Sequence, residues 1–187
     1  MAVRYQHSDV YCMYFCSFTC HNWLPLFEKA QAYHAVYNWF LVLQQTCRCR
    51  VVAYVIMPNH LHCILYFQEP GFNLNTIMGN GKRFMAYTII NILQQQNNAA
   101  LLHMLATAVT EREKKKGQLH KVFIDSFDAK AIFSEKFLQQ KINYIHSNPV
   151  RGKWNLVNDF SDYQHSSASF YETGITKNFT PLHYRDI

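Results

Sequence analysis

The amino-acid sequence predicts an α+β protein, with a mainly antiparallel sheet and helices packed on it. Three observations support this prediction. Strand-like segments with period-two patterns occur early in the chain, hydrophobic residues recur at helical spacing between them, and further helical segments follow. The length of 187 residues is typical of one domain, and 49% hydrophobic against 16% charged residues favours a folded protein over a disordered one. We therefore expect residues 1–187 to form a single domain.

The first expected strand covers residues 10–20, where Tyr, Phe, Cys and Thr dominate. Period two places these side chains on one face: Cys12, Tyr14, Cys16, Phe18 and Cys20. We interpret the cysteines as small buried hydrophobes. The six cysteines of the chain form no C-x-x-C pair, which argues against a zinc ribbon.

The sequence argues against export and membrane insertion. Residues 1–9 are polar and lack the apolar core of a signal peptide, and the longest apolar runs are too short to span a bilayer. We therefore expect a cytoplasmic protein with reduced cysteines and no membrane partner.

The pattern predicts the remaining elements in order. The first group comprises an amphipathic helix at 27–45, strands at 51–56 and 60–67 with a Met57-Pro58-Asn59 turn between them, a glycine-rich loop at 71–81, and helices at 82–96 and 101–109. Basic residues then predict an exposed loop at 110–121. Ser134 is a good N-cap for the last clear helix, and Pro149 ends it. Residues 159–187 are expected to be irregular.

Two histidines with strand spacing are the first chemical signal. Because residues i and i+2 of a strand share a face, His60 and His62 project side by side, while Leu61 and Cys63 turn to the other face. Two parallel imidazoles on a rigid strand make a preformed half of a metal site, although hydrogen-bonded structural histidines are more common.

The second signal lies on the last helix. Tyr144 and Asn148 are four residues apart and share one face, which Phe137 and Lys141 extend. The core face of the same helix is assigned to Leu138, Ile142 and Ile145. A helical tyrosine is usually a packing residue or a surface hydroxyl, so Tyr144 alone would carry little weight.

Together the two signals indicate a tyrosine that attacks a phosphate with the help of a metal ion. A phenol is a poor nucleophile because its pKa is about 10, and a divalent cation beside a phosphate offsets the negative charge that develops there. His60 and His62 would supply two nitrogen ligands and Asn148 an oxygen. Imidazole and amide ligands without a thiolate suit Mg²⁺ or Mn²⁺. Lys141, one turn before Tyr144, would favour the phenolate or contact a phosphate.

Several runs resemble motifs of the single-tyrosine HUH transposases, in the branch called REP-associated tyrosine transposases. Residues 54–62 (YVIMPNHLH) resemble its MPNHxH signature, and residues 141–150 (KINYIHSNPV) its YIHxNPV signature. Residues 162–168 (DYQHSSA) are similar to its YxxSSA segment. Shorter matches occur at 19–27 and 82–84, whereas residues 99–121 have no counterpart that we can place.

The resemblance implies a ferredoxin-like or RRM-like sheet, Tyr144 as the nucleophile, and His60 and His62 as metal ligands with Asn148 as the third. It also implies cleavage of single-stranded DNA that leaves a 5′-phosphotyrosine and a free 3′ hydroxyl, followed by rejoining. The expected substrate is a hairpin beside a short guide tetranucleotide, and the protein would be a monomer or a homodimer near the bacterial nucleoid.

The net charge of +6 suits a polyanionic partner. Lys82 and Arg83 are the first candidates for phosphate contacts, because they would open a helix after the glycine-rich loop; the alternative is that both are solvated surface charges. Lys141 is a third candidate.

Two other functions remain open from the residues. One is a single-stranded nucleic-acid-binding module without catalysis, in which aromatic residues of the sheet stack on bases. The other is a zinc hydrolase that uses His60, His62 and Cys63, although Cys63 should face away from the histidines.

Overall fold

The structure is a computed structural model that describes residues 11–152 and 154–187. The polar segment 1–9 and Val10, the first residue of the first expected strand, lie outside the described residues.

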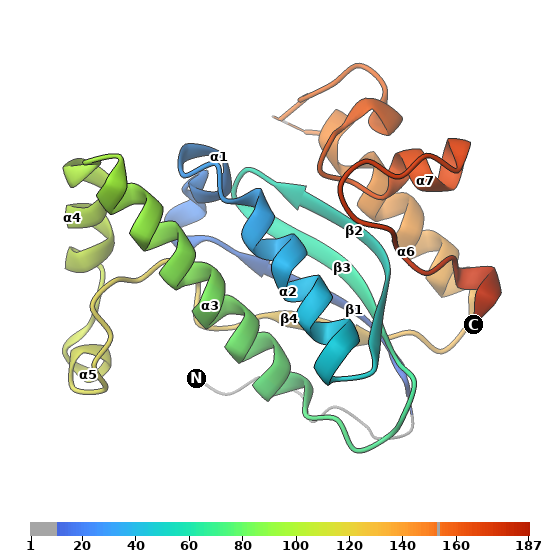
Figure 1. The fold of residues 1–187 in the computed structure, drawn as a ribbon, viewed down its shortest axis with the longest axis horizontal. Coiled ribbons are helices and arrows are strands. Elements are labelled where there is room, and N and C mark those ends of the chain that lie inside the picture. The colour runs from blue at the N-terminus through green and yellow to red at the C-terminus, as the bar shows by residue number, and fades with distance from the viewer. Residues whose placement is uncertain (1–10, 153) are drawn as a thin grey trace.

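The centre of the fold is a four-stranded antiparallel sheet (Figure 1). Its strands are β1 (Met13–Thr19), β2 (Cys49–Met57), β3 (His60–Phe67) and β4 (Asp128–Ala131). They are ordered β2-β3-β1-β4, with one helical region between β1 and β2 and another between β3 and β4. This is the β-α-β-β-α-β connectivity of a ferredoxin-like fold. The predicted α+β class with an antiparallel sheet is therefore confirmed, and β3 has the predicted bounds.

Both faces of the sheet are covered, by different helices (Figure 1). On one face, α2 (Tyr33–Thr46) and α3 (Leu74–Gln95) bury the larger core cluster. Tyr14, Cys16 and Phe18 of β1 belong to this cluster, as their period predicted. On the other face, α6 (Glu135–Ser147) packs over a smaller cluster that includes Phe15, Val55 and Ile64.

The single helix predicted at 27–45 is wrong in one respect, because the structure divides it. A short α1 (Leu26–Lys29) ends before Gln31, whose φ of 50° lies in the left-handed region and interrupts helical geometry. Helix α2 then begins at Tyr33 and buries the face predicted for it, with Val36, Phe40 and Leu43 against the sheet.

The loop predicted at 71–81 is also wrong, because α3 begins at Leu74. Asn73 caps the helix: its side-chain oxygen accepts a hydrogen bond from the Thr76 amide at 3.0 Å. Gly79 and Gly81 therefore lie inside the helix. Gly81 has a packing reason, since a Cβ there would lie 2.6 Å from the Trp39 ring of α2. Close approach of two helices overrides the low helix propensity of glycine.

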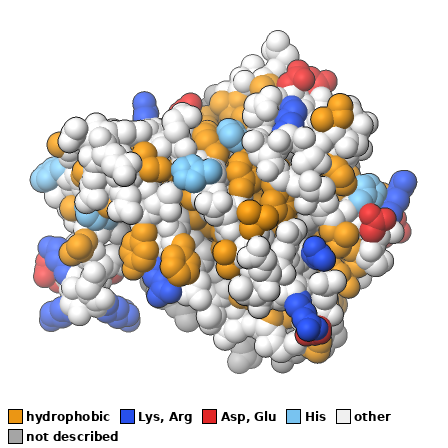
Figure 2. Space-filling model, in the orientation of Figure 1, with side chains coloured by type: hydrophobic (Ala, Val, Ile, Leu, Met, Phe, Trp, Pro, Cys, Tyr) orange, Lys and Arg blue, Asp and Glu red, His pale blue; other side chains and the backbone are white. Residues whose placement is uncertain are grey.

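The region between α3 and β4 contains more structure than predicted. Helix α4 (Ala99–Thr107) covers most of the helix expected at 101–109. The expected basic loop contains α5 (Glu111–Lys114), which Thr110 and Glu113 stabilise through a reciprocal capping box. Figure 2 shows the Lys and Arg side chains gathered at this projecting corner.

The chain after β4 covers the second face of the sheet. Ser134 caps α6 as predicted, accepting a hydrogen bond from the Phe137 amide, and the helix ends at Ser147 just before Pro149. The tail predicted to be irregular contains α7 (Ala168–Thr173) as well as short 3-10 turns. Within the described residues, no helix combines the length and apolar character needed to cross a membrane.

The packing of α3 on α2 yields a stability prediction. Gly81→Ala should lower the free energy of unfolding by about 1–3 kcal/mol, because the new methyl group overpacks the Trp39 contact. Gly79→Ala is the matched control in the same helix, because nothing lies within 4 Å of its Cβ position. It should raise the free energy of unfolding by about 1 kcal/mol, since alanine favours a helix more than glycine does. Urea unfolding of both variants measures this; a stable Gly81→Ala protein would contradict the assigned contact.

Candidate active site

The histidine pair sits at the start of β3, an inner strand of the sheet. His60 pairs with Met57 of β2 and Thr19 of β1, so neighbours on both sides hold its backbone. The two imidazoles lie 4.7 Å apart between ring centres and are each only 7% exposed. The strand spacing therefore brings them together as predicted, on the face that α6 covers.

Asn59 orients the His60 ring. The Asn59 amide nitrogen donates to the Trp23 carbonyl at 3.1 Å, which turns the amide oxygen toward His60 Nδ1 at 2.6 Å. Because that oxygen only accepts hydrogen bonds, Nδ1 carries the proton and Nε2 keeps its lone pair. This is the arrangement by which a neighbouring group fixes the tautomer of a metal-binding histidine.

Tyr144 meets the histidine pair from α6. Its hydroxyl lies 3.4 Å from His62 Nε2, and the two rings contact edge-on with centres 5.1 Å apart. The side chain is 42% exposed, so the hydroxyl lies at the boundary between the buried imidazoles and solvent. One chain is sufficient to bring the tyrosine and the histidines together.

The position of Tyr144 follows from the apolar stripe of α6. Leu138, Ile142 and Ile145 are buried against the sheet, as the helical spacing predicted. The end of the helix is also fixed, because His146 Nε2 lies 2.8 Å from Ser167 Oγ. Ser167 Oγ in turn accepts a hydrogen bond from the Tyr54 amide of β2 at 2.9 Å.

Asn148 stands at the C-cap of α6. Burial has the larger effect on the His60 pKa and lowers it, whereas a hydrogen-bonding contact with the Asn148 side chain raises it. The amide predicted as a third ligand therefore lies beside the first histidine, while Tyr144 lies beside the second. The structure brings all four of these residues together.

Burial keeps both imidazoles neutral. It lowers the pKa of His60 to about 4 and that of His62 to about 3, and repulsion from His60 and from the Lys141 ammonium makes protonation of His62 still less favourable. A histidine must be neutral to bind a metal. At neutral pH the pair therefore has the protonation state that ligation requires.

Lys141 lies one turn before Tyr144 and close to three aromatic rings. Its ammonium is 4.7 Å from the centre of the Phe15 ring, 5.2 Å from that of Phe137 and 5.6 Å from that of Tyr144. Phe15 itself stacks on His62, with centres 5.5 Å apart. Burial lowers the Lys141 pKa, and the nearby charge of Lys130 lowers it further.

The donor set has features of a metal site. His62 Nδ1 is buried and has no hydrogen-bond partner in the described residues. Since Nε2 faces Tyr144, one nitrogen function of His62 is unused, and an unmet buried polar atom costs about 1–3 kcal/mol. Within 11–152 and 154–187, no group of three His, Cys, Asp or Glu residues could hold a metal. The available protein ligands are thus two imidazoles and the Asn148 amide, which fit an ion that also binds substrate oxygens.

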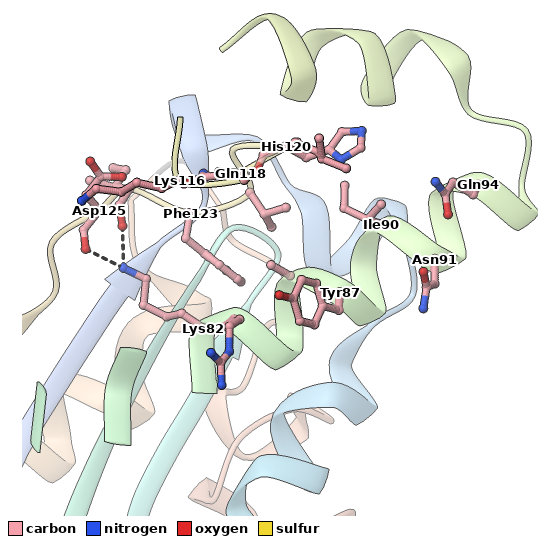
Figure 3. A pocket seen from close by; sticks show the side chains of 16 residues that line it. Lys82, Tyr87, Ile90, Asn91, Gln94, Lys116, Gln118, His120, Phe123 and Asp125 are labelled. Atoms are coloured by element: carbon pink, nitrogen blue, oxygen red, sulfur yellow. Dashed lines mark hydrogen bonds between the residues drawn. The ribbon is translucent and has the colours of Figure 1, made fainter. Parts of the chain in front are cut away.

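Lys82 and Arg83 do not sit where the sequence placed them. Both lie in the middle of α3, so neither meets a phosphate at a helix N-terminus. Figure 3 shows Lys82 reaching from α3 toward the segment before β4. Lys82 and this segment both line a cavity of about 670 Å³. The Lys82 ammonium donates to the carbonyls of Ile124, Asp125 and Ser126 at 2.6–3.2 Å. Lys82 therefore holds this segment in place, whereas Arg83 remains exposed beside Phe84.

The geometry excludes Cys63 from the histidine site. Cys63 is fully buried in the cluster under α2 and α3, on the opposite face from His60 and His62, and burial raises its thiol pKa well above the ordinary value. A zinc hydrolase with these three ligands is therefore ruled out.

Sequence reasoning missed two residues that shape the site. Asn59 was interpreted only as a turn residue, although its position next to His60 was a signal for an orienting contact. Phe15 carried no signal, because the strand pairing that places it against His62 cannot be read from local spacing.

The role of Lys82 can be tested by stability. Lys82→Ala should lower the free energy of unfolding by about 1.5–3 kcal/mol, because three carbonyls lose a charged donor. Arg83→Ala removes the same charge from an exposed neighbour and should change stability by less than about 0.5 kcal/mol. Thermal unfolding compares them; equal effects would show that Lys82 is an ordinary surface charge.

The chain is similar to known proteins in its fold. No protein-family model matches the sequence, and no curated protein matches it. The fold is similar to the solved structure described as the REP-associated tyrosine transposase bound to a REP hairpin, with a TM-score of 0.62. The alignment covers 96% of this chain and 92% of that one, at 16% identity. At this identity the match shows a shared fold, and the shared fold covers nearly the whole of both chains.

Proposed function

We propose that this protein cleaves and rejoins hairpin-containing single-stranded DNA through a 5′-phosphotyrosine on Tyr144. The observation that carries the proposal is the 3.4 Å approach of the Tyr144 hydroxyl to His62 Nε2, beside the neutral histidine pair. A tyrosine nucleophile needs a site of this kind, because an unassisted phenol attacks a phosphate poorly.

Hairpin DNA as the substrate rests on the fold and on charge. The similar solved structure is a transposase bound to a DNA hairpin, and this chain covers 92% of its length. The net charge of +6 suits a polyanion. Lys141 beside Tyr144 and the exposed Arg83 are the cations that we assign to DNA phosphates, whereas Lys82 is engaged by backbone carbonyls.

A divalent metal, Mg²⁺ or Mn²⁺, would be held by His60, His62 and Asn148. The ion would polarise the scissile phosphate and offset the negative charge that builds up during attack. Asn59 serves this set by fixing the His60 ring with Nε2 unprotonated. Asn148 caps the helix that carries Tyr144, so one helix end sets the spacing between nucleophile and ligand.

The proposed cleavage exchanges one phosphoester bond for another. The Tyr144 oxygen forms a bond to phosphorus as the bond from phosphorus to the 3′ oxygen breaks. The phenol proton passes to water at the half-exposed hydroxyl, and the departing 3′ oxygen takes up a proton. The phosphotyrosine conserves the energy of the broken bond, so attack by a 3′ hydroxyl reverses the step and rejoins the strand.

The alternative is a nucleic-acid-binding module without catalysis. In such a module the aromatic residues of an open sheet stack on bases. Here α6 covers that face, and Phe15 and Ile64 are buried beneath it. This arrangement favours the enzyme, and the next experiment separates the two.

Removing only the Tyr144 hydroxyl should abolish covalent chemistry and preserve binding. Tyr144→Phe retains the ring contacts to Phe15 and His62, so the fold should persist. With labelled hairpin DNA, we expect no covalent adduct on a denaturing gel and an affinity within about twofold of the parent, because little binding free energy resides in the hydroxyl. Tyr87→Phe, at another exposed tyrosine, is the control and should form adduct normally. An adduct persisting in Tyr144→Phe would refute the assignment.

Cleavage should require a divalent ion and its ligands. EDTA should stop adduct formation, and Mg²⁺ or Mn²⁺ should restore it. Asn148→Ala should reduce cleavage by roughly ten- to a hundredfold, the range typical for a weakened metal site. Asn148→Asp retains an oxygen ligand and should recover much of that loss at raised metal concentration. Full activity in EDTA, or equal loss in the two Asn148 variants, would show that Asn148 does not bind the ion.

A further inference from the structure

A continuous line of aromatic and basic groups runs through the active site, beyond the residues that the chemistry needs. Its members lie in the 3-10 turn at His21–Trp23, on β3, on α6 and just before α6, and neighbouring members are in contact. In order they are Trp23, His60, His62, Tyr144, Lys141, Phe137 and Phe133. Successive distances are 6.2, 4.7, 5.1, 5.6, 5.2 and 5.3 Å, measured between ring centres or from the Lys141 Nζ atom to a ring centre. The nucleophile and the histidine pair lie in its middle.

Both ends of this line are exposed. Trp23 is 57% exposed and Phe133 is 68% exposed, whereas the histidines between them are buried. Phe133 stacks on Phe137 with the ring planes within 16° of each other. Each end thus offers a large aromatic surface to solvent on either side of the reacting groups.

The backbone at Trp23 adds an independent observation. Asn22 and Trp23 have φ of 49° and 57°, in the left-handed region. A bulky residue there is a genuine outlier, and such strain clusters at functional sites. The Trp23 carbonyl accepts the Asn59 side chain that also orients His60. The same contact network therefore holds the indole at the site and sets the histidine tautomer.

Single-stranded DNA is the ligand that this combination fits. Proteins that bind unpaired strands place bases on aromatic rings and phosphates beside basic side chains. Two lysines supply positive charge: Lys141, a member of the line, lies between Tyr144 and Phe137, and Lys130 pairs with Phe15 on the neighbouring strand. A helix rise of 1.5 Å per residue separates Phe137 from Tyr144 by about 10 Å along α6, a span of about three nucleotides or fewer.

We infer that the unpaired strand follows this line, with one base stacked on Trp23 and another on Phe133, on opposite sides of the phosphate that Tyr144 attacks. This inference rests on the proposed function for the identity of the attacked phosphate. The stacking itself requires only that the protein bind single strands.

The test uses two fluorescent probes: an oligothymidylate strand, and a strand of equal length whose sugars carry no bases. Trp23→Asn and Phe133→Ala should each weaken binding of oligothymidylate at least about fivefold, the lower bound for one lost base–aromatic stack. Neither should weaken binding of the baseless strand by more than about twofold, because the backbone contacts remain. Tyr87→Ala, at a similarly exposed tyrosine on α3, should change neither.

Asparagine is chosen at position 23 because it distinguishes two roles of Trp23, contact with a DNA base and support of the fold. Asparagine tolerates positive φ better than tryptophan, so Trp23→Asn should keep or raise the melting temperature while affinity falls. A second variant, Phe133→Leu, keeps an apolar contact at the start of α6 but removes the stacking ring, and should bind oligothymidylate as weakly as Phe133→Ala.

Unchanged affinity in Trp23→Asn or Phe133→Ala, or equal losses on both probes, would overturn the inference. The inference would also be overturned if Trp23→Asn had a melting temperature so low that unfolding of the variant explained its weaker binding. Covalent adduct formation by each variant is measured in parallel. An adduct with unaltered strand affinity would overturn the stacking line alone, whereas the stacking signature without any adduct from the parent protein would overturn only the nuclease chemistry.

Discussion

The packing of α6 on the second face of the sheet is the constraint on which the site depends. Leu138, Ile142 and Ile145 bury one side of the helix, which fixes its rotation. The helical repeat then directs Tyr144 toward His62 and leaves the Asn148 side chain in contact with His60. The link from His146 through Ser167 to β2 prevents the end of the helix from drifting. Without this packing, nothing would bring the nucleophile on α6 to the histidines on β3.

The site combines features that are unfavourable for the protein alone. Two imidazoles are buried without charge, the Nδ1 atom of His62 has no partner in the described residues, and Trp23 has a left-handed backbone. Buried polar atoms and strained bulky residues destabilise a fold unless something else compensates. A bound ion would satisfy the histidines and a stacked base would cover the tryptophan. Both proposals therefore explain the same group of unfavourable features.

The sequence predicted those parts of the fold and site that follow from local rules. Strand spacing paired His60 with His62, and the Ser134 cap and Pro149 bounded α6 almost to the residue. The features that the sequence did not predict depend on contacts between residues far apart in the chain. Gly81 looked like a loop residue because its partner Trp39 is distant in sequence. Strand β4 is a four-residue edge strand, Asp-Ala-Lys-Ala, without β-branched residues, so only its pairing with β1 defines it. Lys82 seemed free for DNA because the carbonyls it holds lie 42 to 44 residues away.

The residue that becomes covalently linked to DNA identifies the nucleophile most directly. The complex formed with hairpin DNA would be digested with nuclease and protease, and tandem mass spectrometry would identify the peptide that retains a nucleotide. We expect one modified residue among the 12 tyrosines, Tyr144, linked through a 5′ phosphate. A nucleotide on any other residue would contradict this assignment, because Tyr144 is the tyrosine that α6 places against the histidine pair.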